Sequence, residues 1–93
     1  MNDTQFEWLK DQLGDIAIEM KINCETYVRL FEESGDKEAA EWSSGRNYGF
    51  ICGLARGKVA DFATLLRFQT RMMNEAYKEY FDRKEQEHER SEK

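Results

Sequence analysis

Apolar residues recur every three or four positions from Phe6 to Phe31, which matches one face of an α-helix. Thr4 and Glu7 have the spacing of a capping box at its start, and Gly35 is suited to the left-handed residue that ends a helix. We therefore expect a first helix over residues 4–34, about 45 Å long at the helical rise. Its apolar face comprises Phe6, Leu9, Leu13, Ile16, Met20, Cys24, Tyr27 and Phe31.

Three further apolar side chains, Trp8, Ile18 and Ile22, lie away from this main face. A surface helix needs only one apolar stripe, so a second stripe indicates contact with another subunit or a different protein. Scattered exposed apolar residues are also common and need no special explanation. Because a tryptophan is among the three, we interpret them as partner-binding residues.

A second long helix is expected over residues 37–82, with Asp36 as its N-cap and a charged, frayed tail over residues 83–93. Ser43-Ser44-Gly45 and Gly57-Lys58 are its weakest stretches, so it is either continuous or broken near residues 43–45 or 57–58. On a continuous helix the apolar face would comprise Tyr48, Ile51, Cys52, Ala55, Val59, Phe62, Leu66, Met73, Tyr77 and Tyr80.

The predicted fold is all-α, a single domain over residues 1–93 built as an antiparallel hairpin of two long helices. Proline is absent from the chain, which favours long uninterrupted helices. A chain of this size buries only a modest core by itself. We therefore expect an oligomer to complete the core.

Four of the six glycines are spaced four residues apart, at positions 45, 49, 53 and 57. Glycine inside a helix is less favourable than alanine by roughly 0.5–1 kcal/mol. The spacing therefore indicates a packed neighbouring helix, a ligand on the backbone, or a helix end at one of the glycines. Nearby arginines suit a phosphate or carboxylate, although they could instead pair with acids of a neighbouring helix. The glycine–arginine face comprises Arg46, Tyr48, Gly49, Gly53, Arg56, Gly57, Arg67 and Arg71.

The net charge of −5 is distributed unevenly, with −7 on residues 1–43, +4 on residues 44–72 and −2 on residues 73–93. An acidic segment against a basic one suits antiparallel helices. The acidic balance disfavours direct nucleic-acid binding. The polar N-terminal segment does not resemble a signal peptide, and no apolar run is long enough to span a membrane. A cytoplasmic location is therefore expected.

Catalytic chemistry is not visible in the sequence, because no nucleophile lies near a base in a recognisable pattern. His88 is the single histidine, which excludes a multi-histidine metal site. The closely spaced carboxylate pairs are Glu32/Glu33, Glu38/Glu41 and Glu75/Glu79. These pairs lack a common register, so we expect no catalytic residue, no metal and no cofactor. The two cysteines fit apolar helical positions and are interpreted as free thiols.

A short acidic chain of long helices, with an aromatic-rich first helix and Gly-x-x-x-Gly in the second, resembles small accessory proteins of phages and mobile elements in general character. The resemblance implies a non-enzymatic oligomer that binds and blocks a host protein, for example a defence or regulatory protein, in the host cytoplasm. We expect Trp8, Ile18 and Ile22 to contact that partner, with the acidic first helix facing a basic surface. The alternative is sequestration of an anionic ligand, such as a nucleotide or signalling oligonucleotide, on the glycine–arginine face.

Overall fold

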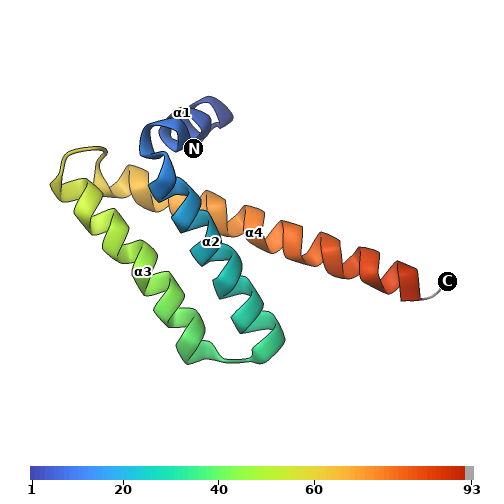
Figure 1. Ribbon diagram of the computed structural model, residues 1–93. Coiled ribbons are helices and arrows are strands. Elements are labelled where there is room, and N and C mark those ends of the chain that lie inside the picture. The colour runs from blue at the N-terminus through green and yellow to red at the C-terminus, as the bar shows by residue number, and fades with distance from the viewer. Residues whose placement is uncertain (92–93) are drawn as a thin grey trace.

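The computed structural model describes residues 1–91, and within that range the chain is helical apart from its connections (Figure 1). The α-helices are α1 (Asp3–Leu13), α2 (Asp15–Arg29), α3 (Lys37–Arg56) and α4 (Phe62–Ser91), and the π-helical turn η1 (Leu30–Ser34) continues α2. The expected all-α class is confirmed. Four helices, however, take the place of the two long ones that the apolar pattern predicted.

The helices α2 and α3 lie side by side and run in opposite directions, joined through η1 (Figure 1). The first part of α4 packs against both of them, and its later part extends beyond the rest of the molecule. The short α1 lies across the end of this arrangement, near the beginning of α4. Segments from both ends of the sequence therefore meet in one body.

The first predicted helix is divided at Gly14, which has φ 54° and ψ −122°. A positive φ is accessible to glycine at little cost, so the chain can turn there between α1 and α2. The predicted capping box is also displaced, because Asn2 and Gln5 form it in place of Thr4 and Glu7. The Asn2 side chain accepts a hydrogen bond from the Gln5 backbone N–H at 2.8 Å.

The second predicted helix is broken after Arg56, at the second of the two weak stretches, whereas α3 continues through residues 43–45. Lys58 has φ 59° in the connection, and α4 begins after Asp61. The Asp61 carboxylate accepts hydrogen bonds from the Thr64 backbone N–H at 2.8 Å and from its hydroxyl at 2.9 Å. These bonds lower the pKa of Asp61 and satisfy an N–H at the helix start.

The residues of the second half that face the core differ from the predicted apolar face. Tyr48, Val59, Phe62 and Leu66, expected on one continuous apolar face, are all exposed. Tyr48 lies on α3, before the break, so the break does not account for its exposure, and the buried side of each helix is turned away from the predicted stripe. The buried residues of α4 are Leu65, Phe68, Met72 and Ala76.

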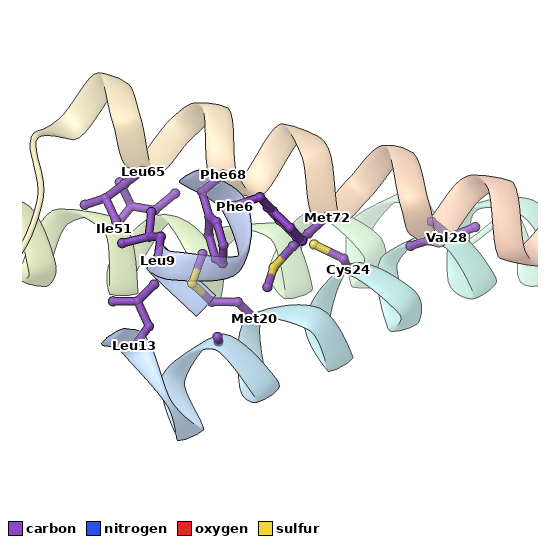
Figure 2. Packing of buried hydrophobic residues seen from close by; sticks show 12 residues of the cluster. Phe6, Leu9, Leu13, Met20, Cys24, Val28, Ile51, Leu65, Phe68 and Met72 are labelled. Carbon is purple, nitrogen blue, oxygen red and sulfur yellow. The ribbon is translucent and has the colours of Figure 1, made fainter. Parts of the chain in front are cut away.

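All four α-helices contribute to a single hydrophobic core, shown in Figure 2. The ring of Phe6 on α1 lies 5.0 Å from that of Phe68 on α4, centroid to centroid. Both rings are almost completely buried, so this contact fastens α1 to the body. The clustered residues are Phe6, Leu9, Leu13, Ala17, Met20, Cys24, Val28, Ile51, Leu65, Phe68, Met72 and Ala76.

One polar side chain, Asn47 of α3, is completely buried beside this core. Its Nδ2 donates a hydrogen bond to the Met20 carbonyl at 3.1 Å and lies 3.4 Å from the Cys24 sulfur. Its Oδ1 accepts a hydrogen bond from Nδ2 of Asn23 at 2.9 Å. Buried polar groups require such partners, so these contacts define one register of α3 against α2.

The predicted frayed tail is helical through Ser91, and residues 92 and 93 lie outside the described residues. The side chains of residues 81–90 are exposed, so this part of α4 has little packing to stabilise it. Lys84 contacts Glu33 of η1 at 3.3 Å and Glu87 of its own helix at 3.6 Å. Such exposed ion pairs contribute little individually.

The two free cysteines are expected to react very differently with thiol reagents. Burial raises the pKa of Cys24 to about 11, while the hydrogen bond from Asn47 acts in the opposite direction. Because the thiolate is the reactive form, iodoacetamide at pH 8 should alkylate the half-buried Cys52 and leave Cys24 intact in the folded protein. Peptide mass spectrometry with and without urea measures this. Equal labelling of both cysteines without urea would contradict the buried position of Cys24.

Candidate functional site

The three predicted partner-binding residues are all exposed, but the structure does not place them on one surface. Ile18 and Ile22 lie one turn apart on α2, with 58% and 54% of their surface exposed. Trp8, on α1, is 59% exposed and lines a different hollow. The turn at Gly14 separates the two helices and so divides the predicted stripe.

Ile18 and Ile22 border a hollow of about 600 Å³ where α1 meets α2. Charged side chains of both signs surround the two isoleucines, and Lys10 pairs with Glu7 at 3.7 Å within this group. An apolar centre inside a polar rim is the usual composition of a protein–protein contact. The lining residues are Glu7, Lys10, Asp11, Gly14, Asp15, Ala17, Ile18, Lys21, Ile22 and Glu25.

Trp8 borders a second hollow, of about 400 Å³, between α1 and the beginning of α4. Leu9 and Ala60 contribute apolar surface there, while Thr64 and Arg67 contribute polar groups. Arg67, which the sequence assigned to the glycine–arginine face, therefore lies beside Trp8. The remaining residues of the lining are Met1 and Gln5.

The glycines inside α3 face open space rather than a neighbouring helix. A Cβ atom added at Gly45, Gly49 or Gly53 would have no heavy atom within 4 Å, its own helix backbone aside. These glycines therefore relieve no crowding within the chain, although each forfeits about 0.5–1 kcal/mol of helix propensity relative to alanine. Gly57 is different, because it caps the end of α3.

The predicted ligand-binding arginines are dispersed. Arg46 and Arg56 are exposed on α3, where Arg46 stacks on Trp42 with 5.3 Å from its guanidinium carbon to the ring. Arg71 lies on α4 and donates hydrogen bonds to Asp3 and to the Met1 carbonyl. The hydrogen bond to Asp3 raises the pKa of Arg71, and a weaker contact joins it to Glu75.

Arg71 also lies over the Phe6 ring, 4.3 Å from its guanidinium carbon to the ring centre. It therefore holds α1 on α4 rather than offering a free charge to a ligand. Tyr48 points its ring toward the edge of Phe62, with 6.0 Å between centroids. Of the predicted glycine–arginine face, the structure brings together Arg46, Gly49, Gly53 and Arg56 on α3. Arg67 and Arg71 lie on α4, and Tyr48 lies on another side of α3, against Phe62.

Sequence reasoning missed Trp42, which is the most exposed large apolar side chain within residues 1–91, at 69%. Trp42 precedes Gly49 by seven residues, or two helical turns, and so lies on the same face of α3. That spacing was present in the sequence as a signal. It was obscured because the tryptophan was assigned only to the helix start.

Within the described part of the chain, no three histidine, cysteine, aspartate or glutamate side chains gather closely enough to hold a metal ion. No helix there is both long and apolar enough to cross a membrane. No family model matches the chain, and no curated protein or solved structure is similar enough to count as a match. Function must therefore be argued from the surfaces of this molecule.

Proposed function

We propose that this protein acts without catalysis, as a small helical module that associates with itself and blocks a surface of another protein. The observation that carries the proposal is the pair of exposed isoleucines on α2, Ile18 and Ile22, in a hollow with a charged rim. Full burial of an exposed side chain of this size is worth roughly 1.5–3 kcal/mol, and a little over half of that remains to be gained at each of these isoleucines. The pair is therefore suited to be the energetic centre of a contact.

Charge supports a basic partner surface. Residues 1–43, which include α1 and α2, carry a net charge of −7. Complementary charge accelerates encounter and selects among partners more than it increases affinity. A host regulatory or defence protein with a basic face is the class of partner that this proposal names, by the general resemblance to phage accessory proteins.

The dispersed arginines favour this proposal over sequestration of an anionic small ligand. Two of the four predicted arginines, Arg67 and Arg71, lie on a different helix from the glycines. Arg71 is already occupied by Asp3 and Glu75. Of the four predicted arginines, a phosphate ligand on α3 would have Arg46 and Arg56 to neutralise it.

Replacing Ile22 with aspartate should reduce capture of the partner at least tenfold, because a charge would be buried in the apolar centre of the contact. Quantitative mass spectrometry of proteins retained by the tagged chain identifies the partner. Titration with the purified partner then measures the change in Kd. Thr70→Asp, an exposed change on α4, is the matched control and should bind like the wild type. Equal binding of the Ile22 and Thr70 variants would contradict the proposal.

A further inference from the structure

One face of α3 is exposed from end to end and carries both an aromatic anchor and opposite charges at its two ends. At 100° per residue, its six residues lie within about 40° of the direction of Gly49. All six are exposed to solvent. This α3 face comprises Glu38, Trp42, Gly45, Gly49, Gly53 and Arg56.

On the α3 face, small and large side chains lie at equal distances on the two sides of Gly49. Gly45 and Gly53 each lie four residues from it, and Trp42 and Arg56 each lie seven residues from it. The charges, in contrast, are opposite on the two sides. On the α3 face itself, Glu38 lies near the N-terminal end and Arg56 at the C-terminal end, with Lys58 just beyond it, while Arg46 lies at the edge of the face.

We propose that the α3 face packs antiparallel against the same face of a second copy of this chain, with Gly49 at the two-fold axis. This inference rests on the self-association part of the proposed function and assigns its surface. In a two-fold contact, residue i of one copy meets residue j of the other and the reverse. Antiparallel packing about Gly49 places Trp42 against the partner's Arg56, and Gly45 against the partner's Gly53.

Charge selects this orientation. Antiparallel packing brings Glu38 of each α3 toward Arg56 and Lys58 of the other copy, whereas parallel packing would oppose Glu38 to Glu38 and Arg56 to Arg56. The dipoles of the two helices are also opposed favourably in the antiparallel arrangement. A guanidinium over the face of a tryptophan is itself an attractive contact, as Arg46 shows on Trp42 within one chain, and the partner's Arg56 would meet the other face of that ring.

The open glycines make the approach possible. Small residues repeated every four positions let two helix backbones come close together, which larger side chains would prevent. Within one chain nothing occupies the space beside Gly45, Gly49 and Gly53. A second α3, itself bare at the same positions, has the shape that fits this space along its whole length.

The first test is the molecular mass in solution, measured by sedimentation equilibrium and native mass spectrometry at micromolar concentration. The wild type should be a dimer, and Gly49→Leu should weaken dimerisation at least tenfold, because a bulky side chain would stand at the axis. Leucine is a stronger helix former than glycine, so circular dichroism should show the monomer still folded. Thr70→Leu, an exposed change on α4, should remain dimeric.

Cross-linking tests the orientation. In a Cys52→Ser background, Gly45→Cys and Gly53→Cys are made separately and then mixed under oxidising conditions. Antiparallel packing brings position 45 of one copy to position 53 of the other. The mixture should therefore form disulfides between the two variants, whereas either variant alone should form no disulfide-linked dimer. Disulfide-linked dimers of Gly45→Cys alone and of Gly53→Cys alone would indicate parallel packing and would overturn the proposal.

Two other outcomes would also overturn it. The wild type could be monomeric, or Gly49→Leu could remain as dimeric as Thr70→Leu. A retained small anion on a monomer in native mass spectrometry would assign the α3 face to a ligand instead. Partner capture and its loss in Ile22→Asp are measured separately, so a failed self-association surface is distinguishable from a failed proposed function.

Discussion

Replacing Phe68 with alanine is expected to lower the free energy of unfolding by about 3–5 kcal/mol. The Phe68 side chain is completely buried on α4, and its ring packs against Phe6 of α1. Alanine would leave a cavity where α1 packs against α4. A domain of this size has roughly 5–14 kcal/mol of stability in total, so the variant should be close to unfolding.

Urea denaturation followed by circular dichroism measures this loss, at a fixed protein concentration because self-association also adds stability. Phe81→Ala is the matched control, since it makes the same change on the same helix at an exposed position. Because the Phe81 ring contacts Tyr77 and Tyr80 at the surface, the control should lower stability by no more than about 1.5 kcal/mol. Similar losses in both variants would contradict the assignment of Phe68 to the core.

Local chemistry predicted the features that depend on a few neighbouring residues. Gly35 ends the second helical segment with φ 64°, as predicted for a left-handed glycine at a helix end. One of the two predicted weak stretches, Gly57-Lys58, is a real break, and Asp61 caps the helix that follows. In each case a glycine or a short polar side chain acts on the backbone beside it.

The break at Gly14 could not be found in this way. Leu13 and Ala17, on its two sides, are both buried, so the apolar pattern continues through the turn without a change of phase. A single glycine is also tolerated inside helices. The position of α1 depends instead on contacts remote in sequence, such as the hydrogen bond from Arg71 to the Met1 carbonyl at 3.3 Å.

The candidate surfaces show the same limit. Ile18 and Ile22 share a surface because they are one turn apart on one helix, which the sequence alone implies. The direction in which Trp8 points depends on the turn at Gly14. Whether the glycines of α3 are packed or open depends on whether another helix lies against them. Both are properties of the tertiary arrangement, which the spacing of apolar residues along the chain does not predict.

Replacing Asn47 with aspartate is expected to lower the free energy of unfolding by about 3–5 kcal/mol at pH 7, because it leaves an unpaired charge buried. The change removes the N–H groups that donate to the Met20 carbonyl and contact the Cys24 sulfur. It puts a negative oxygen in their place, in a completely buried position. Asn23 remains able to donate one hydrogen bond, which does not offset the lost hydration.

The loss should depend on pH in a definite direction. Burial raises the pKa of the introduced carboxyl above its unfolded value, so between the two values the folded state binds more protons than the unfolded state. The free energy of unfolding relative to wild type therefore falls as pH rises through this interval. It recovers as pH decreases toward about 4, the ordinary pKa of an aspartate.

Asn47→Leu separates this charge effect from the loss of hydrogen bonds. Leucine has a similar volume and no charge, and Asn23 is only half-buried, so its freed amide can bind water. We expect Asn47→Leu to cost about 1–2 kcal/mol, with no added pH dependence. Urea titrations of both variants from pH 4.5 to 8 make the comparison. If the two variants lose the same stability at every pH, Asn47 is not enclosed between α2 and α3 as the structure places it.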